Sequence, residues 1–248
     1  MIRVAAVGDL HLGVDSSAQW RDALAPVSDD AELLLLAGDL TRIGTPQEAE
    51  ALAAVLRPVS IPIVAVLGNH DHHAECPARV VEILQGAGVE LLEGSATRHD
   101  VAGVRVGIAG AKGFGGGFPN ACGSEFGEPE MKAFIAHTRR VAAGLGAALA
   151  GLEADLRIAL LHYAPVEDTL RGERCEIFPF LGSYLLGEAI DHAGADLVLH
   201  GHAHSGTEKG VTPGGIRVRN VAQPVIGSAY RLYCFGGAEL ECEAEARR

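Results

Sequence analysis

Short apolar runs recur along this chain, and each ends in a small residue followed by Asp, Asn or His. The first three cover residues 2–7, 33–37 and 63–67, so they begin roughly 30 residues apart. Between the second and third, residues 45–57 open with Thr-Pro-Gln-Glu, which is typical of a capped helix start. Strand, helix and strand at this spacing predict a parallel sheet in an α/β protein.

The rest of the chain repeats this alternation. A second group of apolar runs covers residues 156–161, 197–199 and 216–221. Shorter strands are expected at 89–92, 97–101 and 104–109, a helix at 76–86, and a terminal hairpin of 230–235 and 238–242 around Gly236 and Gly237. We expect one domain over residues 1–248, with a glycine-rich insertion at about 110–128 that acts as a lid or forms a plain surface loop.

Composition and charge narrow the classes of function. The chain is 48% hydrophobic and 21% charged, which is typical of a folded protein. Its 20 Lys and Arg against 32 Asp and Glu give a net charge of −12, whereas nucleic-acid binders need basic surfaces. We therefore expect no nucleic-acid partner. A small phosphorylated substrate is compatible with this charge if a metal ion dominates the local field.

Three features bear on cellular location. The five cysteines are scattered without a C-x-x-C pair, so we expect unpaired thiols and a reducing compartment. The first residues contain no apolar stretch of the length that a signal peptide needs. No apolar run approaches the ~18–20 residues of a membrane span. A cytoplasmic protein without a membrane partner is the expectation.

The polar residues at the strand ends are of the types that bind metals. In parallel α/β sheets, ligands bind outside the carboxyl ends of the strands, so these side chains should meet there. Imidazole and oxygen donors in such a set suit transition metals. The candidate ligands are Asp9, His11, Asp39, Asn69, His162, His202 and His204.

Five short motifs contain these residues, and their combination is specific although each alone is common. The motifs are Asp9-Leu10-His11, Gly38-Asp39, Gly68-Asn69-His70-Asp71, His162 with Pro165, and Gly201-His202-Ala203-His204. In this order they resemble the calcineurin-like metallophosphoesterase superfamily, from about residue 4 to residue 204. The resemblance implies an α/β fold of the metallophosphoesterase type: a layered β-sheet sandwich flanked by helices, with the active site at the strand carboxyl ends.

The resemblance also implies two divalent or transition metal ions, of Mn, Fe, Zn or Ni. Asp9, His11 and His204 would hold the first ion. Asn69, His162 and His202 would hold the second, and Asp39 would bridge both. Two divalent ions bring +4, while two aspartates and a bridging hydroxide return −3, so a charge of about +1 remains to attract a phosphate.

A catalytic pair is implied beside the metals. By resemblance, His70 contacts the phosphoryl group and protonates the leaving alkoxide, and Asp71 is expected to orient and charge it. His72 and His73 are expected at the rim of the site and His200 in the core. One of three arginines could contact the substrate, and these are Arg42, Arg171 and Arg174.

The function implied is hydrolysis of a small phosphodiester or phosphomonoester by a metal-bridging hydroxide. Gly38-Asp39-Leu40-Thr41 followed by Gly44, and then the Gly68–Asp71 motif, look most like the cyclic-nucleotide phosphodiesterase branch. Asp9-Leu-His-Leu-Gly also resembles the repair-exonuclease branch, so a nuclease is the alternative. A lipid-linked nucleotide pyrophosphatase would carry Arg where His70 stands. A non-catalytic scaffold would have lost ligands that this chain retains.

Overall fold

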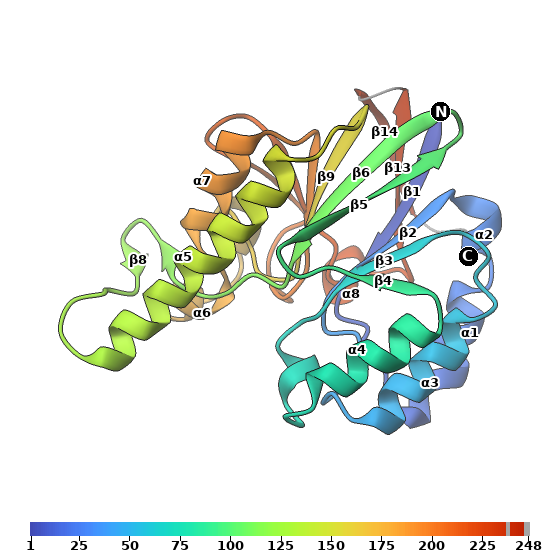
Figure 1. The fold of residues 1–248 in the computed structure, drawn as a ribbon, viewed down its shortest axis with the longest axis horizontal. Coiled ribbons are helices and arrows are strands. Elements are labelled where there is room, and N and C mark those ends of the chain that lie inside the picture. Colours follow the sequence, from blue (N-terminus) through green and yellow to red (C-terminus); the bar gives the residue numbers. More distant parts are fainter. Residues whose placement is uncertain (237–238, 246–248) are drawn as a thin grey trace.

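Two six-stranded sheets pack face to face at the centre of the molecule (Figure 1). The computed structural model describes residues 1–236 and 239–245. The first sheet contains, in order, β14 (Glu239–Glu245), β13 (Arg231–Gly236), β1 (Ile2–Val7), β2 (Leu33–Ala37), β3 (Ile63–Val66) and β4 (Val89–Leu91). The second contains β11 (Lys209–Val211), β12 (Arg217–Asn220), β10 (Leu197–His200), β9 (Leu156–Leu161), β6 (Val104–Ala111) and β5 (Ser95–Val101).

Each sheet has a parallel centre and antiparallel margins. Strands β1 to β4 run parallel to one another, as do β12, β10, β9 and β6. Strands β13, β14, β11 and β5 pair antiparallel with their neighbours. Because parallel strands end at the same edge of a sheet, each sheet gathers several strand ends on one edge.

Helices cover the outer faces of the two sheets (Figure 1). The first sheet is covered by α1 (Ser17–Leu24), α3 (Pro46–Leu56) and α4 (Pro77–Gly86), and the second by α5 (Pro129–Ala150) and α7 (Tyr184–Ala193). The remaining elements are the short helices α2 (Val27–Asp30), α6 (Phe178–Leu181) and α8 (Gln223–Ile226), the strands β7 (Gly117–Phe118) and β8 (Ala121–Cys122), and 3-10 turns at Val14–Ser16, His70–His72, Asp168–Leu170 and Cys175–Ile177. In the described part of the chain, no helix combines the length and apolarity needed to cross a bilayer.

The central strands are buried on both faces, which explains their unbroken apolar sequences. In β1, Val4 and Ala6 pack between the two sheets, whereas Ala5 and Val7 pack under the helices. All four side chains are fully buried. An alternating apolar and polar pattern would have exposed one face of each strand to water, and neither face is free here.

The layered sandwich flanked by helices confirms the expected fold class. The predicted strands lie within a few residues of those observed, and the predicted helix at 45–57 is α3. Its capping box forms: the Thr45 hydroxyl accepts from the Glu48 amide, and the Glu48 carboxylate accepts from the Thr45 amide, both at 3.3 Å. Of the expected hairpin turn, Gly236 ends β13, and Gly237 lies outside the described residues.

The glycine-rich segment is a surface loop only in its second half: residues 119–128 are mostly exposed, whereas the glycines before them pack inside the molecule. Residues 115–118 are buried, and the amides of Gly116 and Gly117 donate to the carbonyls of Pro179 and Gly182 at 2.7 and 2.8 Å. A Cβ at Gly115 would lie 2.3 Å from the Pro179 carbonyl oxygen, so only glycine fits. The glycines therefore serve close backbone packing in this part of the segment.

The expectation of five unpaired cysteines is wrong. Cys234 and Cys242 lie opposite each other on β13 and β14, with Cα atoms 5.0 Å apart, and form a disulfide. The other three cysteines are free thiols. The pairing follows from the hairpin register, and it removes the support that the cysteines gave to a reducing compartment.

Asp71 clamps the loops that follow β2 and β3. Its buried carboxylate accepts from the amides of Gly68, Leu40 and Thr41 at 2.8, 3.1 and 2.8 Å, and from the Thr41 hydroxyl at 2.6 Å. Burial raises the pKa of Asp71, and these hydrogen bonds act in the opposite direction. Both loops carry candidate metal ligands, so this carboxylate fixes their relative position.

We predict that Asp71→Asn lowers the free energy of unfolding by about 2–3 kcal/mol, because an amide presents an N–H group to donors that need an acceptor. Urea unfolding in EDTA measures this without a contribution from bound metal. The control is Asp100→Asn, whose carboxyl group is 86% exposed and should change stability by less than about 0.5 kcal/mol. Equal stability of Asp71→Asn and the wild type would contradict the clamp.

Candidate metal centre

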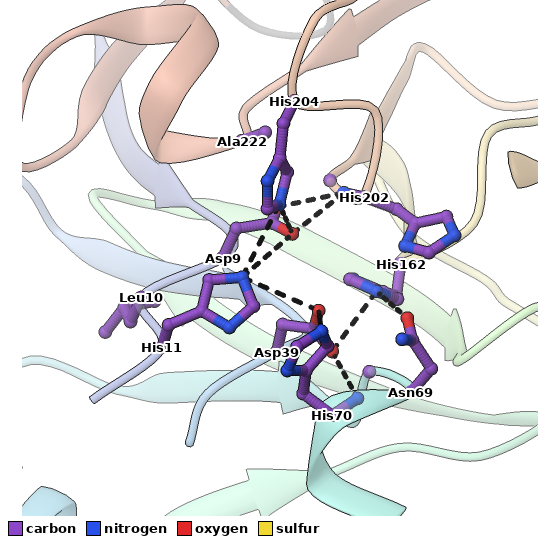
Figure 2. Close-up of polar contacts among 12 residues, drawn as sticks. Asp9, Leu10, His11, Asp39, Asn69, His70, His162, His202, His204 and Ala222 are labelled. Carbon is purple, nitrogen blue, oxygen red and sulfur yellow. Dashed lines mark hydrogen bonds and ion pairs between the residues drawn. The ribbon is translucent and has the colours of Figure 1, made fainter. Parts of the chain in front are cut away.

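The candidate ligands meet where strands of both sheets end (Figure 2). The first sheet contributes four residues and the second sheet three. After β1 come Asp9 and His11, after β2 Asp39, after β3 Asn69, after β9 His162, and after β10 His202 and His204. The site therefore lies across the seam between the two sheets.

Nitrogen and oxygen atoms of these residues form three overlapping groups, in each of which the donor atoms lie within 4.8 Å of one another. The groups are Asp9, His11 and His204; His11, Asp39 and His70; and Asp39, His162 and His202. Asn69 joins the third group, because its Oδ1 lies 3.0 Å from His162 Nε2. All seven candidate ligands are thus brought together, with His70 beside them.

Four of these residues have backbones in the left-handed region. The φ angles are 59° at Asp9, 42° at His11, 48° at Asp39 and 72° at His202. Such conformations cost on the order of 1–3 kcal/mol each for residues with a Cβ, and they concentrate at functional sites. Here the strain turns each chain sharply at its strand end, so that the side chain faces the shared centre.

Two glycines leave room for the carboxylates. A Cβ at Gly68 would lie 2.1 Å from Asp39 Oδ1, and one at Gly201 would lie 2.3 Å from Asp9 Oδ2. Neither distance is compatible with a side chain. The glycine before Asn69 and the glycine before His202 are therefore required by the positions of the two aspartates.

Asp9 and His204 form a charged pair at one end of the site. His204 Nε2 lies 2.8 Å from Asp9 Oδ1, and the His202 amide donates to Asp9 Oδ2 at 2.9 Å. Burial opposes ionisation of Asp9, but the hydrogen bond from His204 and the neighbouring charges hold its pKa below the usual value. The same hydrogen bond raises the pKa of His204. The position between Asp9 Oδ1 and His204 Nε2 therefore favours a positive charge, which is a proton in this structure.

At the other end of the site, two imidazole rings are held by backbone carbonyls. His162 Nδ1 lies 2.9 Å from the Ala37 carbonyl oxygen, which can only accept, so Nδ1 donates there and Nε2 is the nitrogen available to a metal. That Nε2 lies 3.0 Å from Asn69 Oδ1 and 3.3 Å from Asp39 Oδ1. An imidazole nitrogen, an amide oxygen and a carboxylate oxygen are donor types that bind transition metals. The donor set therefore fits a metal ion.

His202 is held in a comparable way. Its Nε2 donates to the Phe180 carbonyl at 3.1 Å, which leaves Nδ1 as the free nitrogen. Burial lowers the pKa of His202 to about 3. A neutral ring with one free nitrogen is the form that binds a metal. The carbonyls of Ala37 and Phe180 are backbone atoms, so no sequence motif could have identified them.

The expectation that Asp71 orients His70 is wrong. All the hydrogen bonds of the Asp71 carboxylate go to the loops after β2 and β3, as described above. His70 Nδ1 instead lies 2.8 Å from the Arg42 carbonyl, and its Nε2 lies 3.9 Å from Asp39 Oδ2. The His70 side chain is 44% exposed, so it lies at the open side of the site. A backbone carbonyl thus orients the ring in place of the carboxylate.

The remaining candidates lie further from the centre. The exposed side chains of Arg42 and Arg171 pair with Asp15 and Asp168, at 2.8 and 2.6 Å. Arg174 is exposed, and so are His72 and His73, as expected for the rim. His200 is buried, as expected, and its Nε2 lies 2.8 Å from the Thr169 hydroxyl. Burial lowers the pKa of His200 to about 4.

Tyr163 was not identified from the sequence. Its ring centroid lies 4.4 Å from that of His202, so it forms a wall of the site. Burial raises the pKa of Tyr163 to about 12, and its hydroxyl is therefore neutral at pH 7. Its position directly after His162 was the one available signal.

Comparison with known proteins connects this geometry to phosphoesterases. A curated Synechococcus protein named "Probable cyclic nucleotide phosphodiesterase" is 34% identical over 92 residues, which cover 33% of this chain and 34% of that protein. The match thus spans about a third of the length of this curated relative.

Solved structures share the fold. A hypothetical protein from Thermus thermophilus superposes with a TM-score of 0.61 at 16% identity, over 99% of this chain and 98% of that one. A Plasmodium protein described as the anchor in the inner membrane complex has a TM-score of 0.54 at 13% identity, over 90% of this chain and 72% of that one. Identities this low show a common fold alone.

The decisive finding covers most of the chain. The family model of the calcineurin-like phosphoesterases matches residues 2–206, which include every strand end of the site. The chain therefore belongs to the calcineurin-like phosphoesterase family, the class of metal-dependent phosphoric ester hydrolases that its five motifs indicate.

Proposed function

We propose that this chain is a two-metal phosphodiesterase acting on a small substrate. Asp9, His11 and His204 hold one ion in this proposal, Asn69, His162 and His202 hold the other, and Asp39 binds both. The observation that carries it is the convergence of donor atoms of the types that bind transition metals: His162 Nε2 lies 3.0 Å from Asn69 Oδ1 and 3.3 Å from Asp39 Oδ1.

The donor types favour a transition metal in this proposal. Four imidazoles, one amide oxygen and two carboxylates suit Mn, Fe, Zn or Ni better than Mg or Ca, which prefer all-oxygen sites. Two such ions supply positive charge for the phosphoryl oxygens and lower the pKa of a shared water. The chain itself supplies the two buried aspartates that hold the positive charge in place.

His70 is the proposed general acid. Its Nδ1 donates to the Arg42 carbonyl, so the ring is fixed with Nε2 facing the site. In the imidazolium form, Nε2 carries the proton that the leaving alkoxide needs. Exposure of the side chain lets solvent restore that proton after each turnover. Because His70 also lies near Asp39 and His11, a ligand role is the competing assignment, and a variant separates the two.

The substrate is proposed to be a small phosphodiester. The printed name of the Synechococcus relative supports this class, and the net charge of −12 opposes a polyanion such as DNA. The repair-nuclease alternative gains no support from the described residues. The Plasmodium anchor protein shows that the fold also occurs in a protein with a different described role, so the site rather than the fold carries the proposal.

The first prediction from the proposed function concerns metal content. Metal-replete protein should hold two transition-metal ions per chain by elemental analysis. Asp39→Ala should lose most of both, because each ion loses a ligand, whereas Asp22→Ala, an exposed position on α1, should keep two. A stoichiometry that stays at or below one ion in the wild type would overturn the two-metal proposal.

The second prediction separates the acid role from the ligand role of His70. His70→Ala should keep both metals and lose roughly 10²–10⁴-fold in kcat. The loss should be smaller for nitrophenyl esters, whose leaving groups need little protonation. The matched control is His73→Ala, which removes an exposed histidine three residues away and should leave kcat unchanged. A His70→Ala protein depleted of metal would assign His70 to the ligands.

The third prediction concerns substrate size. With Mn²⁺, the protein should hydrolyse bis-nitrophenyl phosphate and show little activity on duplex DNA, because its surface charge repels the polymer. Release of nitrophenolate and gel analysis of a linear duplex measure the two activities at physiological salt. Efficient cleavage of DNA ends would favour the nuclease.

A further inference from the structure

A largely apolar cavity opens beside the candidate metal centre. Its volume is about 710 Å³, and it shares Asn69 and Tyr163 with the centre described above. Its lining residues come from both halves of the molecule: the chain after β3, helix α4 and the end of β4 on one side, and residues 112–114 and helix α5 on the other. This volume exceeds what a bare phosphate needs and is within the range of sites for organic ligands.

The lining of the cavity is suited to a ring. Leu67, Leu92, Val81 and Val141 supply aliphatic surface. Phe114 supplies an aromatic ring whose centroid lies 4.5 Å from that of His137, in an edge-to-face arrangement. A ligand ring could make the same kind of contact with Phe114. Because aromatic groups prefer such contacts, a planar ring would gain more binding free energy here than a flexible chain of equal area.

Lys112 is the cation of this cavity. Its Nζ lies 5.2 Å from the ring centroid of Phe114 and 5.1 Å from that of Tyr163. Among the described residues, the one hydrogen-bond acceptor of its ammonium is the Gly113 carbonyl, at 3.3 Å. An ammonium has three donors, so two remain for a ligand. Burial lowers the pKa of Lys112, although the charges of Glu93 and Asp39 oppose this.

The backbone of Lys112 links this cavity to the metal centre. Its carbonyl accepts from the amides of His162 and Tyr163, both at 3.0 Å, and its own amide donates to the Glu93 carboxylate at 3.1 Å. The backbone of Lys112 is thus fixed next to His162, a proposed ligand. The Glu93 carboxylate also lines the cavity, which disfavours a second anionic group in its interior.

We infer that this cavity binds the organic group of the substrate, that this group is a neutral aryl or heteroaryl ring, and that Lys112 positions the phosphate next to it. This rests on the proposed function, since the phosphate must lie at the metal centre. Specificity then comes from the ring in the cavity, while Lys112 contributes to the binding of any phosphate ester.

Direct binding tests this without turnover. Phenylphosphonate and methylphosphonate carry the same anionic group and differ in the ring, and calorimetry on Mn²⁺-loaded protein gives both Kd values. Burial of the ring should make the Kd of phenylphosphonate at least about tenfold lower. Equal Kd values would overturn the inference and leave the two-metal proposal standing. A protein that took up no Mn²⁺ and bound neither compound would overturn both.

Two exposed alanines on helices provide matched variants. Ala78 on α4 lines the cavity, and Ala133 on α5 does not. Ala78→Phe should bring the ratio of the two Kd values close to one and leave that of methylphosphonate unchanged, whereas Ala133→Phe should keep the wild-type ratio. Val141→Phe, at a second lining position, should repeat the effect. A wild-type ratio in both lining variants would overturn the inference.

The role of Lys112 is tested with the same two compounds. Lys112→Met keeps the length of the side chain and removes the charge, so both Kd values should rise by about 3–10-fold with their ratio unchanged. Lys112→Arg should recover part of the affinity because it restores a cation. Unchanged Kd values in Lys112→Met would remove Lys112 from the proposal.

Discussion

Burial of the Asp39 carboxylate is the constraint on which the rest of the site depends. It lies at the seam between the sheets, with His162 Nε2 3.3 Å from one oxygen, and His11 and His70 Nε2 3.8 and 3.9 Å from the other. The His70 amide is a hydrogen-bond donor to it, at 2.8 Å. A buried carboxylate is costly unless positive charge or donors surround it. The left-handed backbone at Asp39 and the missing side chain at Gly68 are the local costs of holding it there.

Most of the fold, and the residues that form the site, could be predicted from the sequence. Continuous apolar strands imply layers on both faces, and the motif residues follow those strands, so their convergence could be predicted. Backbone partners could not: Ala37 and Phe180 act through carbonyls that any residue possesses. For the same reason, the partner of His70 is the Arg42 carbonyl, while the neighbouring Asp71 serves the loops. The Cys234–Cys242 pair needed the register of a hairpin, which spacing alone does not fix.

The fold and the site make different contributions: the fold is shared with other proteins, and the site carries the chemistry. The two sheets and their helices recur in proteins of 13–16% identity, one of them an anchor by description. Within this architecture, the features that distinguish this chain are the polar side chains at the strand ends and the residues that surround them. In this chain the neighbour is an apolar cavity, with Lys112 at the boundary between the metal centre and the ring-sized space. Chemistry and selectivity would then reside in two adjoining groups of residues that share Asn69 and Tyr163.

The bond from His162 to the Ala37 carbonyl has a mechanical consequence. It joins the end of β9 in one sheet to the end of β2 in the other. The hydrogen bonds from His202 and His204 to Asp9 cross the same seam, whereas the layer between the two sheets is apolar and therefore weakly directional. Apolar layers resist separation but tolerate sliding. A hydrogen bond at the seam, together with metal ions bound beside it, would resist sliding of one sheet over the other. Any free energy gained on metal binding would then also oppose this sliding, so the rigidity of the sandwich would vary with the supply of metal.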